Sequence, residues 1–246
     1  MFKARLYGFG VRSLDKVFPD VSAEVSLRYI PVASFLHKKK ADSVLEVGSG
    51  ATGITPYYKH AVTAVDPVLS EGYVPLITAL EGSAQALPVK DSSFDAVISL
   101  DMLEHIPVAD RAKTINEMVR TSRRLVVLGV PSGKTSEQQD LWVDSYYREI
   151  RHEPYHFILE HVELGLPTDE LLQQWADESL RAHGKTGRVT IVHNTNLRVR
   201  RWLMWIWIRA ELSGGFYFKL TNLLVPILRF ANFGACYRSI LYIEMD

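Results

Sequence analysis

Residues 44–53 read Val44-Leu45-Glu46-Val47-Gly48-Ser49-Gly50-Ala51-Thr52-Gly53, an apolar run that passes into a glycine-rich loop. The run predicts a buried strand, and Gly53–Lys59 predicts a helix directly after the loop. Gly48 and Gly50 allow the backbone to bend and to approach a ligand without a Cβ atom in the way. Gly53 would let the helix pack closely on the strand, and free amides at a helix start favour a polar or anionic group. The stretch therefore predicts a ligand-binding turn, with a plain tight turn as the alternative.

Short apolar runs continue on both sides of this loop and alternate with helical segments. This alternation predicts a parallel sheet, which binds ligands beyond the carboxyl ends of its strands. A helix is predicted over Asp110–Ser122, and another over Val21–His37, which Pro31 should bend or split. The predicted strands are Ser43–Val47, Val62–Val65, Leu76–Leu80, Phe94–Leu100, Leu125–Val130, Arg188–His193 and Ser239–Glu244.

Asp66 comes directly after the second predicted strand. A carboxylate at this position can accept hydrogen bonds from both hydroxyls of a ribose. The alternative is an acid that ends a strand in solvent. Together with the glycine loop, Asp66 predicts a site for a nucleoside-containing cofactor, a combination that dinucleotide-binding enzymes share.

The loop and Asp66 belong to a series of ordered motifs between Ala41 and Pro131. The later ones are GSAQALP at residues 82–88, SFDAVIS at residues 93–99 and MLEHIP at residues 102–107. In order and spacing this series resembles the class I S-adenosylmethionine-dependent methyltransferases, most of all their small-molecule branch, which includes the quinone-biosynthesis enzymes. The resemblance implies S-adenosylmethionine as cofactor. It also implies an α/β, Rossmann-like fold whose seven-stranded sheet is mostly parallel, with helices on both faces and an antiparallel last strand.

The resemblance also implies which residues bind the cofactor. Glu46 and the glycine-loop backbone would face the methionine end, and Asp66 would hold the ribose. Many relatives carry an aspartate where Ser83 stands, so adenine contact here would depend more on backbone groups. Pro67, Ser83 and Ala84 would border the adenine, while Leu100, Asp101 and Met102 would form the floor. The whole set is Glu46, Gly48, Ser49, Gly50, Gly53, Asp66, Pro67, Ser83, Ala84, Leu100, Asp101 and Met102.

Methyl transfer from a sulfonium asks mainly for alignment and exclusion of water, and a base is needed only for a hydroxyl acceptor of high pKa. Three histidines are candidates for that base, namely His105, His156 and His161. No metal site is predicted, because Pro154 disfavours the helix on which His152 and His156 would pair. The family's catechol-type members hold a metal with an aspartate like Asp101 and a later Asp-Asn pair, which Leu125–Pro131 lacks.

The whole chain is predicted to be one methyltransferase domain with helical insertions in its C-terminal half. The segment 132–180 holds eleven acids and three bases, and a loop of this length is usually functional. The predicted parts are 1–41 as an N-terminal helical cap, 42–131 as the cofactor-binding core, 132–187 as an acidic lid, and 188–246 as the last two strands with a basic, aromatic insertion at 197–238.

The basic insertion holds seven Arg and Lys residues and one acid, and it includes Trp202, Trp205 and Trp207. Tryptophan beside arginine is typical of membrane interfaces and also of protein interfaces. Packing within the protein or in a homodimer is the favoured interpretation, and peripheral membrane contact is the alternative. The acidic lid could simply pair with this insertion.

Composition excludes several classes. The chain of 246 residues is 47% hydrophobic, enough for a sizeable core, and 28 bases balance 28 acids, which argues against nucleic acid as a partner. Cys236 is the only cysteine, which fits the cytoplasm. No signal peptide is expected at the N-terminus, and the longest apolar run, Trp202–Ile208, is far too short to span a membrane.

The sequence therefore predicts a methyltransferase that modifies a small-molecule or glycan- or lipid-linked acceptor at oxygen. One alternative is an NAD(P)-dependent oxidoreductase, which the glycine loop and Asp66 also fit. No tyrosine is followed four residues later by lysine, however, so the catalytic pair of the short-chain type is missing. The other alternative is a non-catalytic module that the basic insertion tethers to a membrane.

Overall fold

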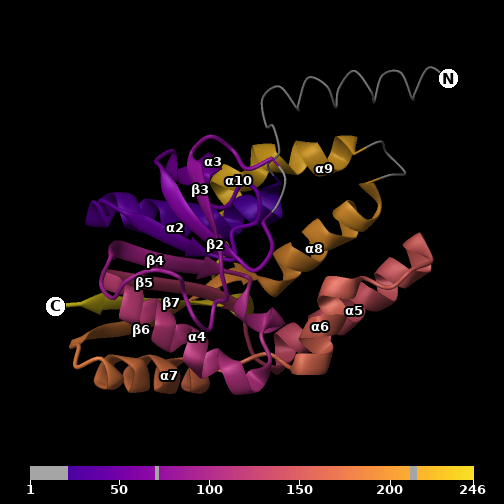
Figure 1. Cartoon of the computed structure of the whole chain (residues 1–246). Coiled ribbons are helices and arrows are strands. Elements are labelled where there is room, and N and C mark those ends of the chain that lie inside the picture. Colours follow the sequence, from indigo (N-terminus) through magenta and orange to yellow (C-terminus); the bar gives the residue numbers. More distant parts are fainter. Residues whose placement is uncertain (1–21, 70–71, 211–214) are drawn as a thin grey trace.

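The computed structural model describes residues 22–69, 72–210 and 215–246, and its centre is one seven-stranded sheet in the order β3-β2-β1-β4-β5-β7-β6 (Figure 1). Strand β7 runs antiparallel to β5 and β6, and every other pairing is parallel. This confirms the predicted fold, including its antiparallel last strand. The strands are β1 (Val44–Val47), β2 (Val62–Asp66), β3 (Ile77–Glu81), β4 (Phe94–Leu100), β5 (Ser122–Pro131), β6 (Gly187–Asn196) and β7 (Cys236–Met245).

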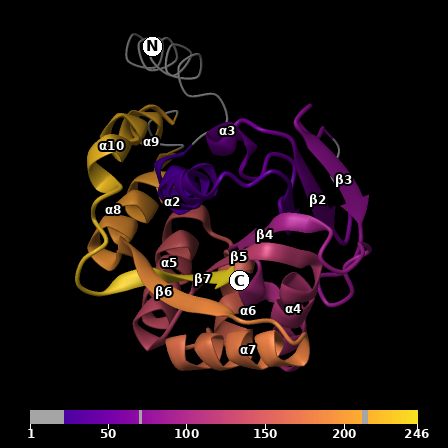
Figure 2. The same cartoon turned by 90° about the vertical axis from the view of Figure 1, so that its left-hand side faces the viewer.

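Helices cover both faces of the sheet, as Figure 2 shows. On one face lie α2 (Ala23–Lys39) and α3 (Thr55–Tyr58), and on the other lie α4 (Val108–Thr121) and α7 (Asp169–Ala182). Side chains alternate between the faces along each strand. Val44 of β1 therefore packs on the side of α2, whereas Leu45 packs on the side of α4. Glu46 points to the same face as Val44, which places its carboxylate under the glycine loop.

Helix α2 runs unbroken through Pro31, so of the predicted bend or split the split is wrong. Ser22 caps the helix by accepting a hydrogen bond from the amide of Val25. A proline inside a helix leaves the carbonyl four residues earlier without its amide donor. Here that carbonyl belongs to Leu27, and the side-chain amide of Asn194 donates to it at 3.2 Å. A contact from β6 thus replaces the missing bond. Of the predicted N-terminal cap, residues 1–21 lie outside the described part of the chain.

The remaining helices gather at one end of the sheet (Figure 1). A buried apolar cluster of Val143, Ile158, Met204 and Ile208 joins α5, α6 and α8, and α8 and α10 pack on α2. Of the described helices, none has both the length and the apolar character to cross a membrane. The helices are α5 (Lys134–Arg151), α6 (His156–Leu164), α8 (Leu197–Ile208), α9 (Phe216–Leu220) and α10 (Val225–Leu228), with short 3-10 turns η1 (Leu103–His105) and η3 (Thr221–Leu224).

Candidate functional site

The glycine loop is anchored between β2 and the end of β4. The amide of Gly48 donates to the carbonyl of Val65 at 2.9 Å, and Gly48 has a φ of 76°. A Cβ atom on Gly48 would collide with the side chain of Met102. A residue with a side chain would therefore be both strained and obstructed here. The close approach joins the loop to Met102, one of the residues predicted for the cofactor floor.

Glu46 lies buried beneath the loop, and its carboxylate accepts a hydrogen bond from the amide of Ile54 at 2.8 Å. The same oxygen fills the space that a Cβ atom on Gly53 would need. Gly53 is thus required by the Glu46 carboxylate, and not by helix–strand packing as predicted. Burial raises the pKa of Glu46 to about 7. Its other oxygen, Oε1, makes no hydrogen bond of regular geometry among the described residues, and the Tyr29 hydroxyl is the side chain that interacts with this carboxylate.

Asp66 ends β2 with its carboxylate turned toward the loop, and the residue is buried. Ser49 Oγ donates to it at 3.1 Å, the Tyr73 hydroxyl at 3.3 Å and the Gly50 amide at 3.4 Å. These bonds are at the long end of the usual range, so ligand hydroxyls could replace them at small cost. The position and the donors fit the ribose-binding role that the sequence predicts.

The residues predicted to surround the adenine follow β2 and β3 directly. Pro67 and Ser83 are exposed, and Ser83 forms an isolated bridge with Ala86. Ala84 is partly buried against the core on the α4 side of the sheet. Leu100 is buried and lies against Gly129. The roles of these four residues toward a cofactor stay predictions.

Asp101 follows β4 and is enclosed by two arginines. Arg238 contacts both of its carboxylate oxygens at 2.5 Å, and Arg28 contacts one of them at 2.8 Å. Burial alone would raise the pKa of Asp101, but Arg238 and Arg28 together hold it well below its usual range. The side chain therefore stays charged and lies at the border between the cofactor floor and the adjacent cavity.

That cavity has a volume of about 260 Å³ and lies beyond the carboxyl end of β4. Its walls come from α2, η1, α6, α8 and the start of β7, so both predicted insertions contribute to it. This is where a parallel sheet of this order binds its ligands. The lining residues are Glu24, Arg28, Asp101, Glu104, His105, Tyr155, Phe157, Ile158, His161, Arg200, Met204 and Tyr237.

Two of the three predicted catalytic histidines meet in this cavity, with their ring centres 4.9 Å apart. His105 Nδ1 lies 2.5 Å from Glu160, and His161 Nδ1 lies 2.9 Å from the buried Asp140. Burial lowers the pKa of His105, which keeps its ring neutral at pH 7. Each ring thus has its Nδ1 fixed by a carboxylate, leaving Nε2 to accept a proton or a ligand.

The third predicted histidine, His156, is exposed at the start of α6 and lies outside the set of residues that line the cavity. His152 ends α5 with a φ of 60°, and Pro154 separates it from α6. The predicted interruption of a His152–His156 helix is therefore confirmed.

Sequence reasoning missed the acids of this site. Glu104 is fully buried in η1, and burial raises its pKa well above the usual range. Asp140 is also fully buried and forms an ion pair with Arg200 at 3.0 Å. This ion pair joins the acidic lid to the basic insertion. An acid within the otherwise apolar run after β4 was a usable signal for Glu104. For Asp140, one acid among eleven, the sequence held none.

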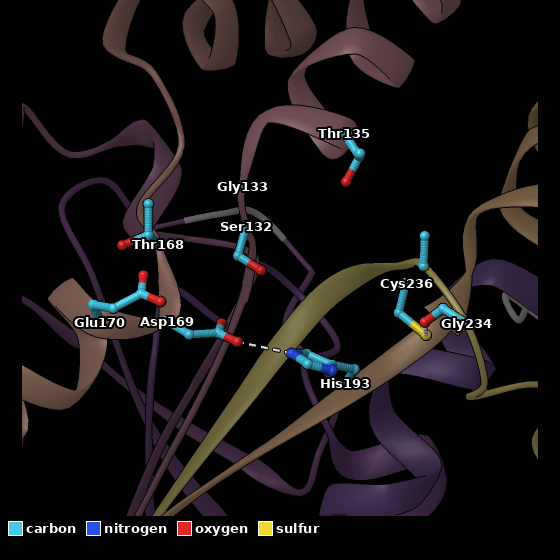
Figure 3. Close-up of a pocket in the computed structure, with 10 residues that line it drawn as sticks. Ser132, Gly133, Thr135, Thr168, Asp169, Glu170, His193, Gly234 and Cys236 are labelled. Atoms are coloured by element: carbon cyan, nitrogen blue, oxygen red, sulfur yellow. Dashed lines mark hydrogen bonds and ion pairs between the residues drawn. The ribbon is translucent and has the colours of Figure 1, made fainter.

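A second cavity, of about 370 Å³, lies between the starts of α5, α7 and β7 and the last residues of β6 (Figure 3). Its Asp169 Oδ2 and His193 Nε2 lie 2.7 Å apart, and both side chains are well exposed to solvent. None of the residues predicted for cofactor binding or catalysis lines it. The first cavity is therefore the better candidate for the acceptor.

Comparisons with known proteins agree with this geometry. The family model described as a methyltransferase domain matches residues 45–126. A solved structure of a putative methyltransferase from an antibiotic biosynthesis pathway of Anabaena variabilis is 17% identical, covers 89% of this chain and 99% of its own, and has a TM-score of 0.54. A putative sarcosine dimethylglycine methyltransferase from Galdieria sulphuraria is 16% identical, with coverage of 87% and 85% and a TM-score of 0.52.

A third structure is phosphoethanolamine N-methyltransferase 2 of Haemonchus contortus, in complex with phosphomonomethylethanolamine and S-adenosylhomocysteine. It is 15% identical with a TM-score of 0.52, over 87% of this chain and 52% of its own. No curated protein sequence matches the chain. At these identities the structural matches support the shared fold, while the match over residues 45–126 concerns the segment that holds the loop and Asp66.

Proposed function

We propose that this chain is a class I S-adenosylmethionine-dependent methyltransferase that methylates a hydroxyl oxygen of a small-molecule, glycan-type or lipid-linked acceptor. The observation that carries the proposal is the group of Glu104, His105 and His161 in the cavity beside Met102. A neutral amine can attack the methyl group with its own lone pair, whereas a hydroxyl must lose its proton as the methyl group arrives.

The residues around the loop fit the cofactor's two ends. Asp66 has the position and the exchangeable bonds to receive ribose hydroxyls, and Glu46 Oε1 is a buried acceptor that makes no regular hydrogen bond with the described residues. The Haemonchus enzyme, which shares the fold, was solved with S-adenosylhomocysteine, the demethylated form of this cofactor. When bound, the cofactor supplies an electrophilic methyl group, and the protein's task is to align the acceptor with it and exclude water.

The walls of the cavity support the acceptor's role. Tyr155 and Phe157 supply aromatic surface on one side, and Met204 adds apolar surface on α8. The cationic side chains are already engaged, since Arg28 pairs with Asp101 and Arg200 with Asp140. A neutral, partly apolar acceptor with a hydroxyl group fits this lining better than an anionic one.

Calorimetry with S-adenosylmethionine and with S-adenosylhomocysteine tests the cofactor, with an NADH titration as the control for an oxidoreductase. We expect binding of the two sulfur compounds and none of NADH. The acceptor is tested with methyl-tritiated cofactor and matched pairs of compounds that differ only in a hydroxyl or an amine. Transfer to the hydroxyl members is expected. A folded protein that binds neither sulfur compound, or that methylates amines alone, would contradict the proposal.

We also propose that the reaction takes place in the cytoplasm, at a membrane surface that the insertion 197–238 contacts. The single cysteine fits a reducing compartment. Support for the membrane comes from the exposed apolar side chains between Tyr217 and Phe233.

A further inference from the structure

We propose that Glu104, His105 and His161 bind one divalent transition-metal ion in the acceptor cavity. Each residue can offer one ligand atom, and these three atoms lie within 4.8 Å of one another. The closest measured pair is Glu104 Oε1 and His161 Nε2, at 3.9 Å. This separation is too long for a hydrogen bond and suits two atoms that face a common third partner.

The buried atoms of this group lack partners. Both carboxylate oxygens of Glu104 and Nε2 of His161 make no hydrogen bond within the described part of the chain, although both residues are more than nine-tenths buried. Buried polar atoms are almost always paired, because an unpaired one loses its hydration without compensation. A cation between these atoms would satisfy all of them at once.

A carboxylate beside Nδ1 orients each of the two imidazoles, as is usual for histidines that bind a metal through Nε2. The Asp140 carboxylate accepts a hydrogen bond from the Tyr237 hydroxyl at 3.0 Å and forms an ion pair with Arg200 at 3.0 Å, so its oxygens act as acceptors here. His161 must therefore donate its Nδ1 proton to Asp140, which leaves a lone pair on Nε2. His105 has the same arrangement with Glu160. Metal-binding histidines usually donate their second nitrogen to a carboxylate in this way.

Two imidazoles and one carboxylate form a ligand set for zinc, iron, cobalt or manganese, with at least one position left for another ligand. At the usual bond lengths of about 2.0–2.1 Å, tetrahedral ligands lie roughly 3.3 Å apart, so the side chains must close by about an ångström. Asp101 matches the metal-binding aspartate of the catechol-type relatives in sequence, but its carboxylate oxygens are already in ion pairs with Arg28 and Arg238. The site thus differs from the one that sequence reasoning rejected.

An ion here would explain how the acceptor loses its proton, a step that rests on the proposed function. A bound cation lowers the pKa of an oxygen that it contacts. The hydroxyl proton would leave to solvent, the new bond would form between that oxygen and the methyl carbon, and the carbon–sulfur electron pair would stay on sulfur. In this arrangement His105 and His161 act as ligands and not as the base.

Metal binding can be tested without any acceptor. The full-length protein is freed of metal with a chelator, and Zn²⁺ is titrated by competition with a chromophoric chelator. Co²⁺ absorption then reports the coordination. We expect one site in the wild type and at least 100-fold weaker binding in Glu104→Gln and His161→Ala. Asp140→Asn should weaken binding roughly 10- to 100-fold. His193→Ala, which removes the exposed histidine of the Asp169 pair, is the matched control and should bind normally.

Absence of a wild-type site would overturn the proposal. Equal affinity in Glu104→Gln or His161→Ala, with circular dichroism confirming the fold, would overturn it as well, as would an equal loss in His193→Ala. Binding of S-adenosylhomocysteine, measured on the same samples, separates the two hypotheses. Metal binding without cofactor binding would refute the proposed function but support the metal site. Cofactor binding without metal binding would refute the metal site but leave the proposed function supported.

Discussion

Asp101 occupies a backbone conformation that few residues other than glycine adopt, with a φ of 52°. A residue in this left-handed region carries a conformational cost, which its surroundings must offset. Here the amide of Asp101 donates to Gly129 at 2.8 Å, and its carboxylate receives Arg28 and Arg238. The turn after β4 is therefore fixed by charge, and it sets the direction in which Met102 and Glu104 leave the strand.

The proposed contact between Asp66 and the ribose of the cofactor can be tested by substitution. Asp66→Ala should weaken S-adenosylmethionine binding by about 1–3 kcal/mol, because ribose hydroxyls would lose a charged partner. Calorimetry on both proteins measures the difference. Glu81 is the matched control, since it is the exposed register partner of Asp66 on β3. Unchanged affinity in Asp66→Ala, or an equal loss in Glu81→Ala, would show that the ribose does not lie on Asp66.

Glu46 gives a prediction about pH. Its pKa is raised from an ordinary 4.5 to about 7 by burial, so between these values the folded state holds a proton that the unfolded state has released. The cofactor-free protein should therefore lose stability as the pH rises from about 4.5 to about 7. Glu46→Gln keeps an acceptor for the Ile54 amide but cannot ionise. It should be more stable than the wild type above pH 7, by at most about 3 kcal/mol.

Denaturant unfolding at pH 5 and at pH 8 measures this effect. The stability advantage of Glu46→Gln should be small at the lower pH and should grow toward the higher one. An advantage that is equal at the two values would mean that Glu46 titrates normally in the folded protein.

Among the elements, those of residues 42–131 were the most predictable. The predicted strand Phe94–Leu100 has the same first and last residues as β4. The central strands β1 and β4 are runs of mostly apolar residues contiguous in the sequence, so they could be recognised from it before their pairing was known. The helix around Pro31 was less predictable, because its missing hydrogen bond is replaced by Asn194, which is distant in sequence. Local sequence patterns thus predict a helix or strand well where residues close in sequence supply its hydrogen-bond partners.

The group of Glu104, His105 and His161 could not be predicted as a unit. It exists because α6 packs on η1, which brings together residues more than fifty positions apart. The sequence marked His105 and His161 as separate candidates but contains no pattern that joins them. The same holds for Asp101, whose partners Arg28 and Arg238 come from opposite ends of the described chain.

Exposed apolar side chains gather between Tyr217 and Phe233, in α9, η3, α10 and the residues directly after α10. Ile227, Phe230 and Phe233 are 71%, 70% and 70% exposed. In the same segment the Arg229 guanidinium lies 4.8 Å from the centre of the Phe230 ring, and Lys219 is part of α9. An apolar surface with basic residues nearby fits a membrane with anionic headgroups. We therefore propose that this surface contacts such a membrane.

Vesicle flotation tests this surface. We expect binding to vesicles that contain phosphatidylserine, weaker binding to phosphatidylcholine alone, and a loss of about tenfold in the double variant Ile227→Asp, Phe230→Asp. Val108→Asp is the control, because Val108 is also exposed but lies on α4. If light scattering instead finds a dimer that the double variant abolishes, with no vesicle binding, the surface is a contact between two copies of the chain.

At the scale of the whole molecule, Arg238 joins the cofactor-binding half to the C-terminal half. Its buried guanidinium on β7 contacts Asp101 after β4, Glu24 on α2 at 3.1 Å and Asn194 on β6 at 3.3 Å. Four elements that are far apart in the sequence thus meet at one side chain. The acceptor cavity borders the same group, so the stability of the fold and the shape of the site depend on shared contacts.

Arg238→Met should therefore destabilise the entire domain, by about 3–5 kcal/mol, because Asp101 and Glu24 would remain buried or half-buried without their common partner. Chemical denaturation followed by both circular dichroism and tryptophan fluorescence measures the loss. Arg148→Met removes the exposed pair with Asp144 and should cost less than about 1 kcal/mol. Adding Asp101→Asn to Arg238→Met should recover part of the stability, since it removes a carboxylate that would otherwise keep only Arg28 as its charged partner. If Arg238→Met is as stable as Arg148→Met, Arg238 does not link the two halves. The same conclusion follows if circular dichroism and tryptophan fluorescence report separate unfolding transitions in Arg238→Met.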